Sequence, residues 1–230
     1  MADMECEPHM LTKYGLPQVA AFPAITGCVM ILLAVFFHGD VWIIPVEALL
    51  FVALIWMFSF FRDPKRSIAY DDSVLYSPCD GTVTEVAADD GGIKVSMFLS
   101  IYNVHINRAP CKAKVGKVAY TKGEFRNAKD PDSARLNEVN EVEMVMTQNP
   151  GETVFVRQIS GAVARRIVCK VKAGDTLEQG QQFGMIKFGS RTELLLQGGG
   201  SREVLVKPGD KVKAGLTAIM RFTDTGIEAL

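Results

Sequence analysis

The chain has 230 residues, of which 48% are hydrophobic and only 22% charged, a composition that excludes disordered, collagen-like and low-complexity proteins. The 25 Lys and Arg residues are balanced by 26 Asp and Glu residues, so no global basic field suggests binding to nucleic acid. Its five cysteines are scattered without a C-x-x-C pair; we therefore expect a reducing compartment, no disulfide framework and no bound metal.

Two long apolar segments near the N-terminus predict a membrane hairpin. Residues 19–37 carry no charge and residues 41–61 carry only Glu47, and each run has about the length needed to cross a bilayer. A buried core hairpin is the alternative; a signal peptide fits the first run poorly, because a second apolar run follows at once. We therefore expect residues 1–18 to form a cytoplasmic segment that precedes a transmembrane hairpin over residues 19–61.

The charges that flank the two apolar runs predict their orientation. Arg62, Lys65 and Arg66 follow the second run and Lys13 precedes the first, whereas residues 38–40 between the runs contain no Lys or Arg. Because basic residues stay on the cytoplasmic side, both ends of the hairpin are expected there, with the C-terminal domain, at the cell membrane. The three basic residues after the second run are also candidates to attract anionic lipid.

The remainder, residues 62–230, has the pattern of a mainly β domain. Residues 93–99 alternate between apolar and mostly polar side chains, which predicts a half-buried strand. Further short β-rich runs occur at residues 115–120, 141–147, 154–159, 185–188, 193–196 and 203–206. Only residues 161–168 suggest a helix, and the polar residues 127–140 predict a long loop.

An internal repeat predicts how these strands are arranged. VKAGDTLEQG at residues 171–180 and VKPGDKVKAG at residues 206–215 share V, K, G, D and the closing G. Two copies of one strand–turn–strand unit indicate two halves of a single β-sandwich, since neither half buries its apolar face alone. The pattern resembles the biotinyl/lipoyl-type barrel-sandwich hybrid, so we expect a domain of that architecture, although no modifiable lysine stands out between the repeats.

Three polar residues of the β-rich part are candidates for catalysis, and each is a weak candidate when considered alone. His105 is a potential general base, yet a lone histidine is more often structural. Asp80 precedes Gly81 in an ordinary turn signal, and Ser190 follows Gly189 between two short runs. The motif G-x-S-x-G of the α/β-hydrolases is absent. The residues by themselves therefore leave the activity of the domain open.

The order of the motifs is far more specific than any one of them. FFRDP, SPCDGTV, VHINRAP, NEVNE, GAVARRIV and GMIKFGSR follow one another along the chain. This series resembles the phosphatidylserine decarboxylase family in its short, archaeal-type form, and the resemblance covers about residues 56–196. The FGSR motif in this context is the strongest single signal.

The resemblance implies a self-processing enzyme. Ser190 Oγ is expected to attack the carbonyl carbon of Gly189, and elimination then releases a β chain of residues 1–189 from an α chain of residues 190–230. Ser190 is thereby expected to become an N-terminal pyruvoyl group, the covalent cofactor of the family. Glycine before the serine leaves the carbonyl unobstructed and tolerates an unusual backbone conformation.

The resemblance also implies roles for neighbouring polar residues. His105 is the expected base for the hydroxyl of Ser190 and the later proton donor to the substrate, and Asp80 is expected to orient its imidazole. The longer bacterial form has a second histidine where this chain has Arg108, and LGST or LGSS in place of FGSR. His105 is therefore expected to cover what two histidines share in the longer form, or a water or Arg108 takes one of these roles. Arg108 and Arg191 are in addition candidates for binding the substrate. Two arginines of GAVARRIV also match the family pattern, without an assigned role.

The implied reaction converts phosphatidylserine in the membrane to phosphatidylethanolamine and CO₂ through a Schiff base between the pyruvoyl group and the serine amine. The resemblance further suggests a homodimer. Decarboxylation of archaetidylserine or another phosphoserine lipid is an alternative within the same class. A membrane-anchored biotinyl/lipoyl-like carrier or adaptor is the alternative from another class, although residues 189–202 are too short for the helical hairpin that such an adaptor needs.

Overall fold

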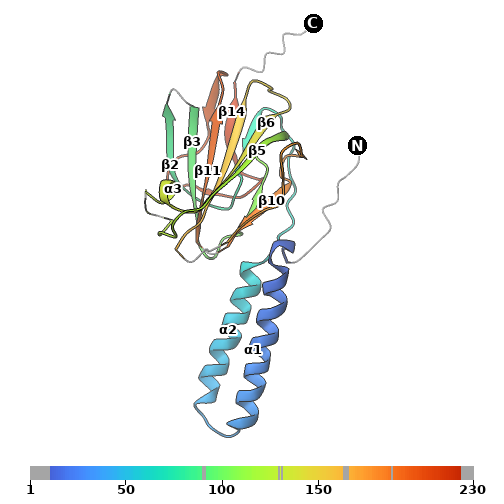
Figure 1. Cartoon of the computed structure of the whole chain (residues 1–230), viewed down its shortest axis with the longest axis vertical. Helices are drawn as coiled ribbons and strands as arrows, with labels where there is room; N and C mark the ends of the chain where they lie inside the picture. The colour runs from blue at the N-terminus through green and yellow to red at the C-terminus, as the bar shows by residue number, and fades with distance from the viewer. Residues whose placement is uncertain are drawn as a thin grey trace. The chain divides into compact units, whose positions relative to one another are not determined.

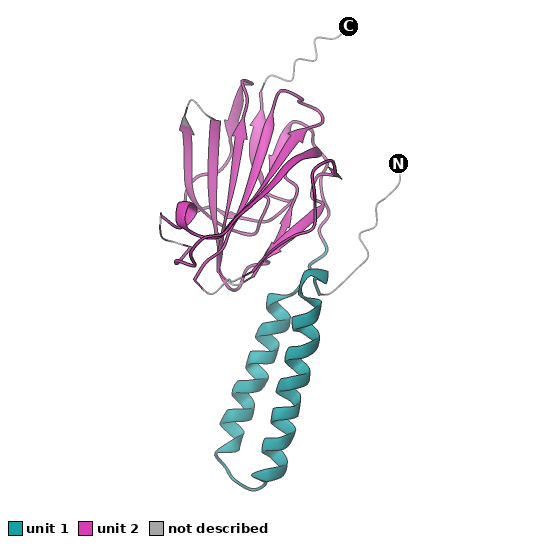
Figure 2. Ribbon diagram, in the orientation of Figure 1, with its two compact units in different colours: residues 1–65 teal, residues 66–230 magenta. Residues whose placement is uncertain are grey.

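A computed structural model describes residues 11–89, 92–128, 130, 132–162, 166–187 and 189–223 of the chain. It divides the chain into two compact units, of which the first ends at Lys65 and the second begins at Arg66 (Figures 1 and 2). The sequence predicts a boundary between residues 61 and 62, in the same connecting segment.

The first unit is an antiparallel pair of apolar helices. After the short 3-10 helix η1 (Lys13–Gly15), α1 (Leu16–Phe36) and α2 (Ile43–Phe60) are joined by a tight turn, in which Gly39 adopts a φ of 95° (Figure 1). Both helices are long and apolar enough to cross a membrane. Phe36 is 75% exposed and Leu49 69%, which excludes the alternative of a buried core hairpin and is compatible with membrane association.

The second unit is mainly β, as the sequence predicts. The strands of the large sheet are β2 (Gly81–Asp89), β3 (Gly92–Leu99), β5 (Ala113–Thr121), β6 (Val139–Met146), β7 (Thr153–Ile159), β9 (Thr176–Leu177), β11 (Ser190–Gln197) and β13 (Lys211–Val212). They pair in the order β13-β2-β3-β11-β7-β6-β5-β9, and every pairing is antiparallel. Figure 1 shows β11 within this sheet, beside β3.

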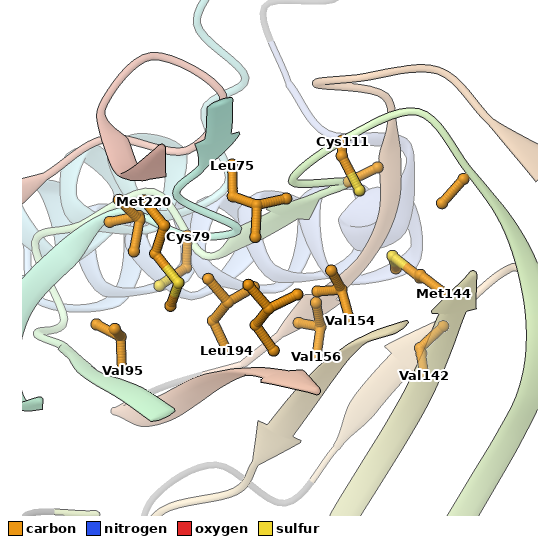
Figure 3. Packing of buried hydrophobic residues seen from close by; sticks show 14 of the residues in the cluster. Leu75, Cys79, Val95, Cys111, Val142, Met144, Val154, Val156, Leu194 and Met220 are labelled. Carbon is orange, nitrogen blue, oxygen red and sulfur yellow. The ribbon is translucent and has the colours of Figure 1, made fainter. Parts of the chain in front are cut away.

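Two small sheets complete the unit. One has the order β1-β14-β12, from β1 (Val74–Tyr76), β14 (Ala218–Phe222) and β12 (Arg202–Val204). The other has the order β4-β10-β8, from β4 (Ile106–Arg108), β10 (Gln182–Ile186) and β8 (Ile167–Cys169). The hydrophobic core lies between the sheets: Leu75 and Met220 from the first small sheet point toward Val95, Val156 and Leu194 of the large sheet (Figure 3).

The two repeated segments fold in the same way. In the first repeat the Asp175 carboxylate accepts a hydrogen bond from the backbone N–H of Lys172 at 2.9 Å, and in the second Asp210 accepts one from Lys207 at 2.9 Å. The strand after each turn then pairs with the large sheet at opposite edges, β9 with β5 and β13 with β2. The repeat is therefore a pseudo-symmetric structural duplication.

The closing glycines of the repeats meet under the segment that enters the second unit. Gly180 and Gly215 adopt φ angles of 75° and 73°, and their N–H groups donate to the carbonyls of Ala109 and Ser77, both at 2.8 Å. A Cβ on either glycine would lie within 2.8 Å of the Ile68 side chain. Both positions therefore require glycine for two reasons, the left-handed backbone and the close packing of Ile68.

Two local predictions are wrong. The predicted helix over residues 161–168 is not formed: Ile167 and Val168 belong to β8, which pairs with β10, while residues 163–165 lie outside the described residues. The predicted loop over residues 127–140 contains the short helix α3 (Ser133–Leu136) and the beginning of β6. In both places tertiary pairing with a distant strand decides the backbone, and local pattern does not contain that information.

Candidate active site

The predicted cleavage site lies where the chain enters β11. Gly189 has a φ of 63°, and Ser190 begins the strand, paired with Leu99 of β3. The left-handed conformation, which glycine adopts at no steric cost, turns the chain from the small sheet of β10 into the large sheet. Gly189 and Ser190 are therefore held by pairing on the C-terminal side and by a sharp turn on the N-terminal side.

The hydroxyl of Ser190 is buried without a hydrogen bond. The residue is 0% exposed, and Oγ has no hydrogen-bond partner among the residues that the structure describes. Leaving a buried hydroxyl unsatisfied costs about 1–3 kcal/mol. Such a group in a folded protein asks for an explanation, and a reactive role is one of the few available.

His105, directly before β4, presents a defined tautomer. Its ring is fully buried, and Nδ1 lies 2.9 Å from the carbonyl oxygen of Asn103. A carbonyl only accepts hydrogen bonds, so Nδ1 carries the proton in this contact. In the neutral imidazole Nε2 is then the basic nitrogen, which is the form that a general base requires.

The structure brings the segments of His105 and Ser190 together. Asn107 Nδ2 donates to Thr192 Oγ1 at 3.3 Å, so β4 and β11 face each other at these positions. His105 precedes Asn107 by two residues, as Ser190 precedes Thr192, and residues two apart in extended chain share a face. The carbonyl of His105 also accepts from Ile186 N–H at 3.1 Å, just before the turn. The histidine and the serine therefore line the same end of the interior.

A chain of buried amides fixes this arrangement. Asn140 Nδ2 donates to Gln158 Oε1, and Gln158 Nε2 donates to Asn107 Oδ1, both at 2.9 Å. All three side chains are almost completely buried. In this chain each amide donates to the oxygen of the next one, which fixes which end of each side chain is N and which is O. The Nδ2 of Asn107 is therefore directed toward Thr192 of β11. The sequence analysis missed this chain, for which the only signal is polar residues inside otherwise apolar strands.

Among the described residues Asp80 is bound by Arg66 and Ala214 and not by His105, so the geometry does not support the prediction that Asp80 orients the imidazole. One of its oxygens accepts from the Ala214 backbone N–H at 2.9 Å, and Arg66 binds the carboxylate through both of its terminal nitrogens, each at 2.8 Å. Arg66 also donates to the carbonyl of Ala214 at 2.6 Å, and its side chain is only 5% exposed. The Asp80 carboxylate is thus engaged by Arg66 and by the Ala214 N–H. Arg66, buried in this ion pair, is not available to attract anionic lipid.

Neither arginine predicted to bind the substrate has a free guanidinium near Ser190. Arg108 Nη1 donates to the carbonyl of Gly180 at 3.0 Å, on the opposite face of β4 from Asn107. Arg191 follows Ser190 in β11, so its side chain points to the opposite face of the sheet. The structure therefore does not support direct contact of either side chain with a group attached to residue 190.

Arg191 instead belongs to a network of charges on the outer face of the sheet. Its Nη2 lies 3.0 Å from Glu193 and 3.2 Å from Glu85, and Arg157 Nη1 lies 2.6 Å from the second oxygen of Glu193. Glu193 is 1% exposed. The network joins β11 to its neighbour β7 and to β2, which lies one strand beyond β3, on the face away from Ser190.

The segment before Gly189 also carries a buried cation, Lys187. Lys187 is almost completely buried, and its backbone N–H donates to the carbonyl of Arg166 at 3.3 Å. Burial, together with the nearby charge of Arg166, lowers the pKa of the Lys187 ammonium. Arg165, the other arginine of the GAVARRIV motif, lies outside the described residues.

Comparison with known proteins points to one family. The family model described as phosphatidylserine decarboxylase matches residues 53–220. Relatives named phosphatidylserine decarboxylase proenzyme include one from Rhodopirellula baltica, 38% identical over 227 residues that cover 95% of this chain and 93% of the relative. The relative from Carboxydothermus hydrogenoformans is 42% identical over 181 residues, covering 76% and 83%. That from Symbiobacterium thermophilum is 38% identical over 229 residues, covering 96% and 99%.

Proposed function

The chain belongs to the phosphatidylserine decarboxylase family, which makes it a carboxy-lyase, and on that premise we propose that it converts phosphatidylserine to phosphatidylethanolamine and CO₂. The observation that carries the proposal is the buried hydroxyl of Ser190, which has no hydrogen-bond partner among the described residues and directly follows a left-handed glycine. The relatives are named as proenzymes, which implies a precursor that is cut into two chains.

The cut is proposed at the peptide bond between Gly189 and Ser190. Ser190 Oγ attacks the carbonyl carbon of Gly189, the C–N bond breaks, and an ester links the two residues. Loss of the Ser190 Cα proton then expels the carboxylate of Gly189 from Cβ and leaves dehydroalanine. Addition of water and loss of ammonia convert this residue to a pyruvoyl group. The products are a β chain of residues 1–189 and an α chain of residues 190–230.

His105 is the proposed base for this step. Its Nε2 takes the proton of Ser190 Oγ, while the Asn103 carbonyl holds the proton on Nδ1 and keeps the ring in the productive tautomer. In serine proteases a carboxylate performs the orienting role. Here a backbone carbonyl takes that place, because the ion pair with Arg66 occupies Asp80.

The residues around position 190 fit a pyruvoyl group. The position is fully buried, its flanking turn is formed by glycine, and the imidazole lies at the same end of the interior. The group would supply an electrophilic carbon for the serine amine of the lipid and a sink for the electrons released with CO₂. His105 Nε2 then delivers a proton to the carbon that lost its carboxylate.

We propose that the apolar helices of the first unit anchor the enzyme in the membrane that contains its lipid substrate. A phospholipid headgroup projects from the bilayer, and an enzyme anchored there avoids extracting acyl chains, at about 0.8 kcal/mol per CH₂ group. We propose that the hairpin crosses the cell membrane with the β-rich unit on the cytoplasmic side, as the flanking basic residues indicate. A homodimer is part of the proposal on family resemblance alone.

Other lipid backbones are compatible with the same chemistry. Archaetidylserine and related phosphoserine lipids present the identical reacting headgroup, so side-by-side assays with these lipids distinguish them from phosphatidylserine. The carrier or adaptor alternative requires an intact chain, whereas the decarboxylase requires a cut chain.

The first test is the intact mass of the purified protein beside Ser190→Ala. We expect fragments 1–189 and 190–230 from the wild type, the latter with a blocked, carbonyl-reactive N-terminus, and an uncut Ser190→Ala chain. The second Gly-Ser bond, between Gly200 and Ser201, provides the control, since Ser201→Ala should be cut normally. A fragment 201–230, or a folded wild type that stays intact and releases no CO₂ from phosphatidylserine, contradicts the proposal.

A further inference from the structure

The strand opposite the cleavage site ends in a serine and a glycine of its own. β7 pairs with β11 in a regular antiparallel register, in which Ile159 lies opposite Arg191. Continuing that register by one and two residues places Ser160 opposite Ser190 and Gly161 opposite Gly189. The closest contacts of Gly161 agree with this continuation, because they are with the backbone of Gly189.

Gly161 leaves room for one particular atom, the carbonyl oxygen of the bond that is cut. A Cβ built on Gly161 would lie 1.9 Å from the carbonyl oxygen of Gly189 and 3.0 Å from its carbonyl carbon. Cβ atoms do not approach other heavy atoms closer than 3.0 Å. Any side chain at position 161 would therefore push the Gly189 carbonyl, or the backbone of residue 161, by about 1 Å.

The backbone before Gly161 is held in place from both sides. Ser160 N–H donates to the carbonyl of Glu138 at 3.0 Å, and the Ser160 carbonyl accepts from Asn137 Nδ2 at 2.7 Å. The Cβ of Ala128 would lie 3.3 Å from a Cβ at position 161. The hydrogen bonds of Ser160 and the contact with Ala128 prevent the backbone of residue 161 from moving away from Gly189. The carbonyl of Gly189 is therefore the group that must move.

We propose that Gly161 is a positioning residue for self-cleavage, because its missing side chain is the space into which the scissile carbonyl of Gly189 projects. The inference rests on the proposed cleavage between Gly189 and Ser190. When Ser190 Oγ attacks, the carbonyl oxygen must keep its direction while the carbon becomes tetrahedral. A methyl group at position 161 turns that oxygen away, and a misplacement of about 1 Å costs on the order of 10²-fold in rate.

The test compares Gly161→Ala with Gly151→Ala, at the two ends of β7. Gly151 is exposed, and a Cβ there would have no atom within 4 Å. Conversion of the full-length precursor to fragments 1–189 and 190–230 is followed by mass spectrometry after synthesis is stopped. We expect about 10²-fold slower conversion for Gly161→Ala and the wild-type rate for Gly151→Ala. Conversion of Gly161→Ala at the wild-type rate overturns the inference.

A second pair of measurements separates positioning from folding. Both substitutions are introduced into the uncut Ser190→Ala chain, where we expect cooperative thermal unfolding that persists well above the temperature of the conversion assay. If Gly161→Ala fails to fold, Ala128→Gly is added to open space behind the new methyl group, and conversion is measured in that double variant. A folded and slow double variant supports the proposal, and a folded variant that converts at the wild-type rate overturns it.

Hydroxylamine identifies the step that is affected. It cleaves the ester between Gly189 and Ser190, so it converts accumulated ester to fragments but leaves an unreacted amide intact. We expect a brief hydroxylamine treatment to release no additional fragments from the Gly161→Ala precursor, because the attack is the slowed step and no ester accumulates. Release of fragments would place the defect after the attack and refute the role. Absence of wild-type cleavage between Gly189 and Ser190 would instead refute the proposed function, so the two failures are distinguishable.

Discussion

At the scale of single residues, two neighbouring hydroxyl groups, one at the start of β11 and one directly after β7, have no hydrogen-bond partner among the described residues. Ser190 Oγ and Ser160 Oγ are both buried and lack hydrogen-bond partners among the described residues. Each costs about 1–3 kcal/mol relative to a satisfied hydroxyl. For Ser190 the proposed attack explains why the cost is retained. Ser160, its cross-strand neighbour, faces the same cost without a step in the reaction.

We predict that Ser160→Ala stabilises the protein. In the uncut Ser190→Ala chain, this substitution removes an unsatisfied hydroxyl and should raise the free energy of unfolding by about 1 kcal/mol. The matched control is Ser77→Ala, because Ser77 Oγ donates to the Cys79 carbonyl at 2.7 Å and its loss should destabilise by about 1 kcal/mol. Thermal unfolding of the three proteins measures both effects. Equal destabilisation by the two substitutions would show that Ser160 has a hydrogen-bond partner in solution.

A second prediction at this scale concerns Asp80. Its carboxylate neutralises the buried guanidinium of Arg66, so Asp80→Asn leaves an uncompensated charge and should cost about 3–5 kcal/mol in the uncut chain. Replacing both residues, as in Arg66→Met with Asp80→Leu, should recover much of that loss. A stable Asp80→Asn protein that nevertheless fails to cut itself would instead support the catalytic role predicted from the sequence.

The sequence proposes which residues form this site, but it could not predict which side chains contact one another. The ordered motifs pointed to Gly189, Ser190 and His105, and the structure places their segments at one end of the interior. The partner of Asp80 could not be predicted, because Arg66 lies in a linker whose charge also satisfies the positive-inside pattern. A basic residue that follows an apolar run can either set the orientation of a membrane helix or form a buried ion pair. Only the tertiary structure distinguishes these two explanations.

At the scale of elements, β11 is the strand that would hold the α chain after the proposed cleavage. It lies between β3 and β7, both of which belong to the β chain, and β13 and β14 add pairings with β2 and β1. Buried Glu193 binds Arg191 of its own strand and Arg157 of β7. The proposed cut would therefore remove one covalent bond and leave the strand pairings of β11 in place.

We predict that the two chains copurify after cleavage and separate only in denaturant, and that Glu193 contributes to this. Glu193→Ala leaves two arginines without their shared carboxylate and should destabilise the assembly by about 3–5 kcal/mol. Lys94→Ala serves as the control, because its ion pair with Glu85 is well exposed and worth under about 1 kcal/mol. The α chain retained after incubation in urea is the measurement. Equal retention in both variants would show that strand pairing alone holds the α chain.

The two buried thiols of Cys79 and Cys111 predict that stability depends on pH. Burial raises the pKa of the Cys79 thiol, and burial together with the charge of Asp72 raises the pKa of the Cys111 thiol from 9.0 to about 12. Above pH 9 the unfolded chain therefore releases protons that the folded chain keeps. Stability should fall as pH rises from 9 toward 12, by up to about 1.4 kcal/mol per pH unit for each thiol.

Unfolding of the Ser190→Ala chain between pH 8 and pH 10.5 measures this slope, and Cys111→Ala provides the comparison. Because the substitution removes one titrating group, the decline above pH 9 should become shallower, whatever its effect on stability at pH 8. An unchanged slope would show that the thiol is ionised in the folded protein or that other groups dominate.

The elements themselves could be predicted where the pattern was local. Alternation predicted β3, and the repeat predicted the paired turns that end at Gly180 and Gly215. The strand β8 was mistaken for a helix because a three-residue strand gains its stability from β10, not from its own sequence. Likewise, the opposition of Gly161 and Gly189 depends on the register of β7 and β11, which no local pattern contains.

At the scale of the whole molecule, the precursor combines an exposed apolar helix pair with a β-rich unit that has its own core. Arg66 belongs to the ion pair with Asp80, so Arg62 and Lys65 remain as the basic residues that follow α2 and govern orientation. Their position predicts that the β-rich unit faces the cytoplasm. Its substrate is then the lipid of the cytoplasmic leaflet.

This orientation predicts a difference between two vesicle preparations. Protease added to sealed inside-out vesicles should degrade the β-rich unit, whereas right-side-out vesicles should protect it, because transferring the basic flank of α2 across the membrane is unfavourable. The variant Arg62→Gln with Lys65→Gln removes that bias and should give a mixed pattern, while Lys211→Gln with Lys213→Gln, remote in sequence from the helices, should not. Protection in inside-out vesicles would place the unit, and the headgroup it decarboxylates, on the other side. The helices would then still anchor the enzyme, but the positive-inside argument would not hold for this chain.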